Sequence, residues 1–208
     1  MASQIFSRLI NNQLFTKLTW LRFIGFEFWM VGFTPFFIGF VVASNKLYDF
    51  NLFYGFLVIA ILASSTFVLN HIYDLELDRK NPRKEFSLLV RGTISTKNAW
   101  FLFLFLQISC IVLSFYFFNN EFLLCILGLT LISFVYNIPP FRFKTKPGLD
   151  LVSNGLSLGF LIPLSAWSIY QPIIEFPKLY FFSIICYLLA LYCPTMAVDV
   201  EFDRKFGT

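Results

Sequence analysis

The stretch that decides the fold, residues 52–80, reads LFYGFLVIAILASSTFVLNHIYDLELDRK. Apolar residues dominate its first part up to Tyr73, and acidic and basic residues follow from Asp74 onward. The hydrocarbon core of a bilayer is about 30 Å thick, so one helical crossing needs roughly 20 apolar residues. The stretch therefore predicts a transmembrane helix with a charged cluster at one end.

Further apolar runs of similar length occur on both sides of this one. Together they predict spans at residues 20–43, 52–73, 99–118, 122–137, 149–170 and 179–198. The chain is 58% hydrophobic and 13% charged, and this charged share is about half that of a soluble domain. We therefore expect an all-α membrane protein with six transmembrane helices. Residues 1–19 are expected to form an amphipathic interfacial segment, followed by a transmembrane domain at 20–208.

Positive charges are unevenly distributed between the two sides of the predicted membrane. Of 16 Lys and Arg residues, only Lys46 and Lys178 fall in segments that would lie outside. Lys and Arg near span ends stay on the cytoplasmic side, so both termini and the charged end of 52–80 are expected to be cytoplasmic. In a membrane protein the placement of Lys and Arg matters more than the net charge, here +4. We therefore expect a lipid bilayer but no nucleic acid as a partner.

Two segments far apart in the chain share an acidic pattern. Residues 74–80 read DLELDRK and residues 199–205 read DVEFDRK, each at the end of an expected helix. Residues four apart lie on one face of a helix, so each segment presents two carboxylates on one side. The pairs are Asp74 with Asp78 and Asp199 with Asp203. Asn70 lies one turn earlier and extends the first pair into a stripe.

Four carboxylates at one membrane face repel one another unless a cation neutralises them. Mg²⁺ prefers oxygen ligands and typically bridges one or two carboxylates to the phosphates of a substrate. We therefore predict a magnesium and phosphate site. Its metal ligands would be Asn70, Asp74, Asp78, Asp199 and Asp203. A simpler interpretation is that each pattern only marks a membrane boundary; two near-identical copies favour the metal site.

These motifs resemble those of the UbiA superfamily of intramembrane prenyltransferases. Members carry NxxxDxxxD after the second helix and DxxxD after the sixth, and residues 70–78 and 199–203 match these patterns. Residues 136–144, YNIPPFRFK, are similar to the family loop that contacts diphosphate. Residues 91–95, RGTIS, also look like a family stretch.

The chain departs from the family pattern in two respects. His71 stands where many members have a second aspartate. The family fold usually has nine spans in a ring around a central chamber, and the last three have no counterpart here. The resemblance therefore implies either a truncated product or one half of a split enzyme whose partner chain supplies the missing helices.

The resemblance implies Mg²⁺-dependent transfer of a prenyl group from a prenyl diphosphate to a lipophilic acceptor within the membrane. The catalytic carboxylates would be Asp74, Asp78, Asp199 and Asp203, one of which would take the proton that the acceptor loses. The diphosphate would be bound by Asn70, Lys84, Tyr136, Arg142 and Lys144. Quinone precursors, carotenoids, tetrapyrroles and glyceryl lipids are all used as acceptors in the superfamily, and these residues do not choose between them.

Three other functions stay open. A CDP-alcohol phosphotransferase also uses paired aspartates and Mg²⁺, but its D-x-x-D-G-x-x-A-R spacing is absent from the sequence. A divalent-cation transporter would place polar ligands near the bilayer midplane, whereas these acidic residues lie at one face. The third is an inactive or split subunit of a prenyltransferase, which the smaller number of spans keeps open.

Overall fold

A computed structural model describes residues 19–146, 148–177, 179, 180, 182 and 186. Every regular element in this part of the chain is helical, which confirms the expected all-α class. The elements are η1 (Phe26–Phe28), α3 (Trp29–Ser44), α4 (Phe50–Asp78), η2 (Pro82–Lys84), α5 (Thr96–Phe117), α6 (Asn120–Asn137), η3 (Phe143–Thr145), α7 (Leu149–Asn154), η4 (Gly155–Leu161), α8 (Ile162–Ser168) and η5 (Ile173–Glu175). Three parts of the prediction lie outside the described residues: the amphipathic segment, nearly all of the sixth span, and the second acidic pair, Asp199 and Asp203.

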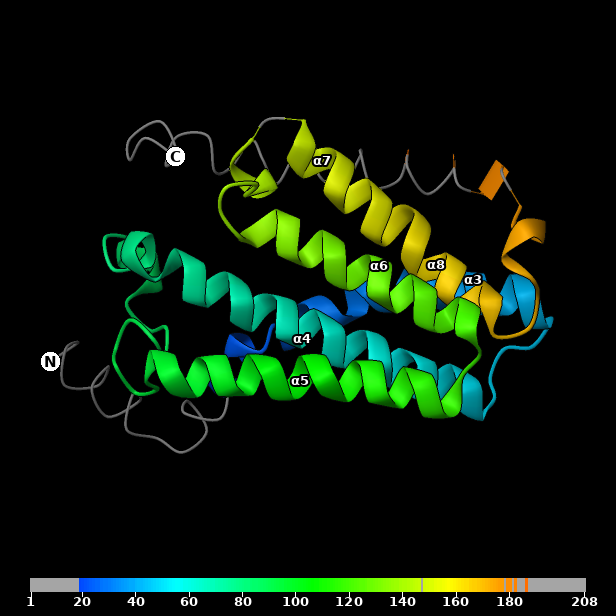
Figure 1. Ribbon diagram of the computed structural model, residues 1–208, viewed down its shortest axis with the longest axis horizontal. Helices are drawn as coiled ribbons and strands as arrows, with labels where there is room; N and C mark the ends of the chain where they lie inside the picture. The colour runs from blue at the N-terminus through cyan, green and yellow to red at the C-terminus, as the bar shows by residue number, and fades with distance from the viewer. Residues whose placement is uncertain (1–18, 147, 178, 181, 183–185, 187–208) are drawn as a thin grey trace, which may run out of the picture.

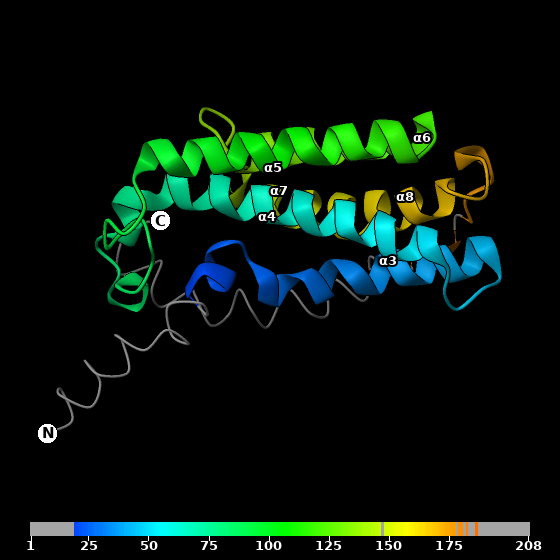
Figure 2. The same cartoon turned by 90° about the horizontal axis from the view of Figure 1, so that it is seen from below.

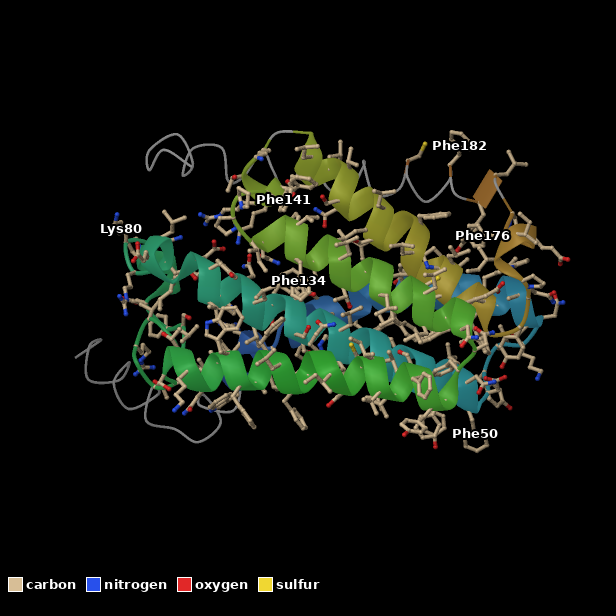
Figure 3. All side chains as sticks on the ribbon, viewed as in Figure 1. Phe50, Lys80, Phe134, Phe141, Phe176 and Phe182 are labelled. Atoms are coloured by element: carbon tan, nitrogen blue, oxygen red, sulfur yellow. The ribbon has the colours of Figure 1, made fainter. Side chains whose placement is uncertain are left out.

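The long helices form a bundle with their axes roughly along one direction (Figure 1). α4 packs along α5, and α3 packs along α8 on the other side of α4 (Figure 2). Figure 3 shows Lys80, just after α4, at one end of the bundle and Phe50, the first residue of α4, at the opposite end. The charged end of α4 therefore lies at the same end of the bundle as the start of α5.

Five helical segments are long and apolar enough to cross a membrane. They are Phe26–Ser44, Phe50–Asp78, Thr96–Phe117, Asn120–Asn137 and Leu149–Ser168, and they correspond to the first five predicted spans. The first span was predicted to begin at residue 20, but the chain turns at Gly25, whose φ is 68°, so the continuous helix begins at Trp29. α4 continues to Asp78, past the predicted end at residue 73. The first acidic pair is therefore fixed within a helix.

Side-chain caps explain where three of these helices begin. The Asp49 carboxylate accepts a hydrogen bond from the Leu52 amide at 3.1 Å before α4. Before α5, the Ser95 hydroxyl oxygen accepts a hydrogen bond from the Asn98 amide at 3.2 Å. Asn119 accepts from the Phe122 amide before α6 at 2.8 Å. Such caps satisfy amides that the first turn of a helix leaves without a partner. The short polar residues between apolar runs thus fix the starts of the spans.

A polar layer inside the bundle joins α4, α5 and α6. The Ser65 hydroxyl donates to Gln107 Oε1 at 2.7 Å, and Gln107 Nε2 donates to the Thr130 hydroxyl at 2.8 Å. All three side chains are buried. In apolar surroundings, hydrogen bonds between helices contribute about 0.6–2 kcal/mol each. Gln107 therefore fixes the relative positions of the three helices that lead to the charged end.

Close packing of α3 against α8 depends on Gly39. A Cβ atom added at Gly39 would lie 2.4 Å from the carbonyl oxygen of Pro163, closer than non-bonded atoms approach. Pro163 lies at the start of α8, directly after the π-helical η4. A proline cannot donate a backbone hydrogen bond to the preceding turn, and a local widening of the helix is one way to accommodate it. Glycine at position 39 lets α3 pack against this irregular segment.

We expect Gly39→Ala to lower the apparent melting temperature of the chain in detergent by about 5 °C, because overpacking a tight contact costs about 1–3 kcal/mol. Gly32→Ala is the matched control. Gly32 lies two turns earlier in the same helix, and a Cβ there would meet its nearest atom at 3.5 Å, so this variant should keep or raise the melting temperature. Equal melting temperatures for both variants would contradict this account of the α3–α8 contact.

Candidate functional site

The acidic end of α4 meets the loop that follows α6. Arg142 donates from Nη2 to Asp74 Oδ1 at 2.8 Å, and Lys144 donates from Nζ to Asp74 Oδ2 at 2.8 Å. Each oxygen of the Asp74 carboxylate thus has its own cationic donor. Charge-assisted hydrogen bonds of this kind are roughly twice as strong as neutral ones. The contact joins two of the sequence motifs into one cluster of charges.

Three oxygen atoms surround the Lys144 ammonium. Besides Asp74, Lys144 donates to Asn70 Oδ1 at 2.6 Å and to Asn137 Oδ1 at 3.2 Å. Its side chain is only 11% exposed. Burial lowers the pKa of Lys144 below its usual range and Arg142 acts in the same direction, while the Asp74 carboxylate opposes both. The oxygens of α4 and α6 therefore converge on one point of positive charge.

The backbone of the loop aims both cations at α4. Arg142 has φ 40° and ψ 55°, in the left-handed region, where a residue other than glycine costs of order 1–3 kcal/mol. The turn is held by a hydrogen bond from the Arg142 amide to the Ile138 carbonyl at 3.0 Å. The Thr145 hydroxyl donates to the Arg142 carbonyl at 3.0 Å. These contacts stabilise the turn that carries Arg142 and Lys144.

Asp78, the second carboxylate of the motif, faces His71; its charge raises the pKa of Lys144, but no ion pair joins it to the basic loop among the described residues. His71 Nδ1 lies 3.8 Å from Asp78 Oδ2, which is too long for a hydrogen bond. Nδ1 is buried and has no hydrogen-bond partner in the part of the chain that the structure describes. The imidazole ring stacks on Phe23, with ring centroids 5.1 Å apart. The two carboxylates of α4 therefore have different neighbours.

A second buried acid, Asp150 at the start of α7, lies next to Tyr136. The Tyr136 hydroxyl donates to Asp150 Oδ1 at 2.8 Å, and Asn154 Nδ2 donates to the same oxygen at 3.0 Å. Asp150 is 7% exposed. The hydrogen bond fixes the direction of the Tyr136 hydroxyl, one residue before the Asn137 that binds Lys144. Asp150 thereby joins α7 to the end of α6 that carries the site.

The predicted residues divide into four sets. Asn70, Asp74, Arg142 and Lys144 lie together, as their assignment to one site requires. Asp78 and Tyr136 lie on the adjoining turns of α4 and α6 but contact His71 and Asp150. Lys84 ends the short helix η2, and no contact joins its side chain to the cluster among the described residues. Asp199 and Asp203 lie outside those residues.

Sequence reasoning missed Asn137 and Asp150. Asn137 is fully buried beside Tyr136, within a stretch that had been matched to a diphosphate loop, but only the structure shows that its side chain turns toward Lys144. Asp150 carries a signal that could have been used, because an ionisable residue at the start of an apolar span is a functional candidate by default.

The donor atoms fit a divalent cation with oxygen ligands. Asn70 Oδ1 and Asp74 Oδ2 both bind the Lys144 ammonium, so they already share one centre of positive charge. Mg²⁺ needs only one or two carboxylates when substrate phosphates and water complete its coordination. Among the described residues, no group of three His, Cys, Asp or Glu side chains could hold a metal ion. A complete site therefore needs the Asn70 amide or ligands from elsewhere.

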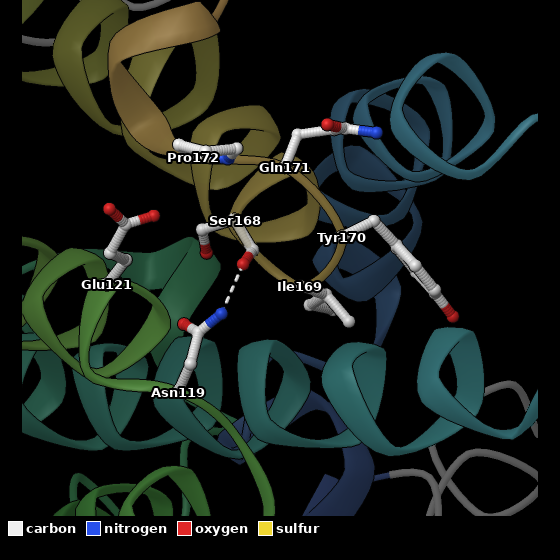
Figure 4. A pocket seen from close by; sticks show the side chains of 7 residues that line it. All are labelled: Asn119, Glu121, Ser168, Ile169, Tyr170, Gln171 and Pro172. Carbon is white, nitrogen blue, oxygen red and sulfur yellow. Dashed lines mark hydrogen bonds between the residues drawn. The ribbon is translucent and has the colours of Figure 1, made fainter.

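A polar hollow lies at the other end of the bundle. It has a volume of about 240 Å³ and is lined by Asn119, Glu121 and residues 168–172 (Figure 4). Asn119 Nδ2 donates to the Ser168 carbonyl, and Glu121 Oε2 accepts a hydrogen bond from the Ile173 amide at 3.0 Å. These contacts close the turn after α8 against the start of α6. The hollow is remote from Asp74 and is a structural feature of that turn.

Comparison with known proteins identifies the family of the chain. The sequence profile of the UbiA prenyltransferase family matches residues 32–208. A 2-acyl-4-prenylphloroglucinol 6-prenyltransferase from Humulus lupulus is 35% identical over 118 residues, which are 54% of this chain and 28% of that protein. A 2-acylphloroglucinol 4-prenyltransferase from the same plant is 30% identical over 170 residues, which are 72% of this chain and 38% of that protein. The chain thus spans less than half the length of these relatives.

Solved structures agree with the sequence comparison. A UbiA homologue from Archaeoglobus fulgidus bound to DMAPP and Mg²⁺ is 26% identical, has a TM-score of 0.80, and matches over 91% of this chain and 66% of its own. The same homologue bound to GPP and Mg²⁺ is 28% identical with a TM-score of 0.80 and the same coverage. The helical bundle therefore has its counterpart in these solved structures. The chain belongs to the UbiA prenyltransferase family.

Proposed function

We propose that this chain carries out Mg²⁺-dependent transfer of a prenyl group from a prenyl diphosphate to a lipophilic acceptor within the membrane. One observation carries the proposal: Asp74 on α4 binds Arg142 and Lys144 of the loop after α6. The cluster supplies carboxylate and amide oxygens for a metal ion and two cations for a diphosphate, side by side. The homologue structures with DMAPP or GPP and Mg²⁺ support this assignment.

The metal ligands in this proposal are the first stripe, Asn70, Asp74 and Asp78, together with Asp199 and Asp203 of the second motif. When bound, Mg²⁺ would supply positive charge to the leaving diphosphate. Arg142 and Lys144 donate charge-assisted hydrogen bonds to the diphosphate oxygens as negative charge develops on them. Lys84, the last residue of η2, is the third cation proposed for the diphosphate.

Tyr136 has a positioning role in this proposal. Its hydroxyl is held by Asp150 at 2.8 Å, so the ring and the hydroxyl direction are fixed beside the Asn137 that binds Lys144. A fixed hydroxyl needs no reorganisation when the diphosphate arrives. Through this hydrogen bond, Asp150 holds the start of α7 against the end of α6, next to the proposed diphosphate site.

The acceptor is proposed to be a lipophilic molecule with a phenolic ring. Support comes from relatives whose names specify acylphloroglucinol substrates, and from a probable homogentisate phytyltransferase of Oryza sativa that is 28% identical over 169 residues. One aspartate of the two motifs would take the proton that the acceptor loses. Because the acceptor is lipophilic and the bundle is apolar, the acceptor would reach the site from the bilayer.

We further propose that the acidic end faces the cytoplasm. Lys80 and Phe141 lie toward the same end of the bundle in Figure 3. Most Lys and Arg residues of the chain precede or follow helices at this end, and the asymmetry of such residues sets the orientation of helical membrane proteins.

We expect Asp74→Asn to weaken Mg²⁺-dependent binding of radiolabelled geranyl diphosphate to the chain in lipid nanodiscs by about 10- to 100-fold. The substitution removes one charge from the metal site and leaves two partly buried cations with less compensation. Asp74→Glu keeps the charge and should retain part of the binding. Glu76→Gln is the matched control, because Glu76 is exposed on another face of the same helix and its loss should change binding less than about twofold.

The same preparation tests transfer, with phenolic acceptors offered first. Formation of a labelled, acceptor-linked product that requires Mg²⁺ and is lost in Asp74→Asn supports the proposal. If the wild-type chain binds no geranyl diphosphate even with Mg²⁺, the enzymatic function fails. Binding without transfer to any acceptor would instead favour the interpretation as a subunit that needs further helices.

A second substitution tests the basic loop. We expect Lys144→Gln to weaken binding of inorganic diphosphate in the presence of Mg²⁺ by about tenfold, because a hydrogen bond to a charged group contributes about 1.5–3 kcal/mol. Lys146→Gln is the control, since Lys146 lies two residues away, is exposed and contacts the Phe143 ring. Isothermal titration calorimetry measures both affinities. Equal losses in the two variants would show that only the total charge of the loop matters.

A further inference from the structure

Four donor side chains occupy one arc of α4. Successive residues of an α-helix turn by about 100°, which places the four within about 100° of the helix circumference. They are Asn70, His71, Asp74 and Asp78. The contacts divide them into two pairs: Asn70 and Asp74 share the Lys144 ammonium, and His71 faces Asp78. The second pair shares no cation among the residues that the structure describes.

The His71–Asp78 pair is polar, enclosed and not hydrogen-bonded. The two side chains are 13% and 12% exposed, and the nearest atoms, His71 Nδ1 and Asp78 Oδ2, are 3.8 Å apart. His71 Nδ1 is buried without a partner in the described part of the chain. A buried polar group left in this state costs about 1–3 kcal/mol. A cation that binds His71 Nδ1 would remove this cost for His71, and Asp78 Oδ2 is the carboxylate oxygen placed to bind the same cation.

The geometry suits two ligands of one metal ion. Neighbouring ligands of a six-coordinate ion with bonds of about 2.1 Å lie about 3 Å apart, so the pair needs to close by less than about 1 Å. Phe23 is 3% exposed, and its ring stacks on the imidazole at an interplanar angle of 12°. This stacking restricts the plane of the imidazole ring, and Nδ1 lies on the edge of the ring nearest Asp78.

We propose that His71 Nδ1 and the Asp78 carboxylate bind one divalent ion of the site, which gives this chain a mixed nitrogen and oxygen ligand set. The inference rests on the proposed function, because this ion would also bind the substrate diphosphate. Carboxylate oxygens suit Mg²⁺, whereas imidazole nitrogen raises the affinity for later transition metals such as Co²⁺. The site therefore holds Co²⁺ more tightly relative to Mg²⁺ than a site with aspartate at position 71 would.

The sequence makes a direct spectroscopic test available, because His71 is the only histidine among 208 residues. The chain is purified through a tag without histidine, placed in lipid nanodiscs and loaded with Mn²⁺ and inorganic diphosphate. Electron spin-echo envelope modulation then detects nitrogen bound to Mn²⁺. We expect a ¹⁴N modulation that changes to the ¹⁵N pattern when the chain is made with ¹⁵N-histidine. This isotope exchange needs no mutation, so loss of folding cannot imitate the result.

Two variants serve as controls, and the possible negative results distinguish this inference from the proposed function. His71→Asn should lose the modulation, and Glu76→Gln should keep it. Bound Mn²⁺ without nitrogen modulation, or a modulation unaffected by ¹⁵N-histidine, overturns the inference and leaves the proposed function standing. Absence of bound Mn²⁺ in the presence of diphosphate overturns both.

Metal competition gives an independent measurement. The concentrations of Mg²⁺ and of Co²⁺ that displace half of the bound Mn²⁺ are measured, and their ratio is compared between the wild-type chain and His71→Asp. We expect the Mg²⁺-to-Co²⁺ ratio to be about tenfold higher in the wild type, because the variant has only oxygen ligands at this position. An unchanged ratio overturns the inference.

Discussion

The Asp74 carboxylate, held between Arg142 and Lys144, is the interaction on which the geometry of this molecule depends. Removing an ion from water costs several kcal/mol unless opposite charges and hydrogen bonds replace the solvent. Here each carboxylate oxygen has a cationic donor at 2.8 Å, and Asn70 and Asn137 complete the surroundings of Lys144. The contact fixes the end of α4 against the loop after α6. In the apolar interior, Gln107 of α5 joins α4 and α6 through its hydrogen bonds to Ser65 and Thr130.

The same arrangement explains how one cluster can serve two kinds of ligand. Asp74 and Asn70 offer oxygens, which suit a metal cation, and Arg142 and Lys144 offer donors, which suit phosphate oxygens. Without either ligand, the single Asp74 carboxylate binds both cations and offsets one of their two positive charges. With both ligands bound, Asp74 and Asn70 would contact the metal ion, and Arg142 and Lys144 would contact the diphosphate, in place of their contacts with one another.

Part of this architecture could be predicted from the sequence. The helical class and the first five spans follow from apolar runs of sufficient length, and the association of Asn70 and Asp74 with Arg142 and Lys144 followed from motif resemblance. The continuous helix of the first span begins later than predicted, at Trp29, because the chain turns at Gly25 in a left-handed backbone conformation. Asn137 and Asp150 were missed, since their importance comes from contacts between α6, α7 and the loop. The direction of Asp78 toward His71 likewise depends on packing against Phe23.

The length of α4 determines where in the membrane this chemistry would take place. The helix has 29 residues and is therefore about 43 Å long, whereas the hydrocarbon layer is about 30 Å thick. Its final turns, with Asp74 and Asp78, extend into the zone of lipid headgroups. An amphiphilic isoprenoid diphosphate is anchored in that zone with its tail among the acyl chains. It would reach the helix end by lateral diffusion within one leaflet, so its surface density, not its aqueous concentration, would set the rate of encounter.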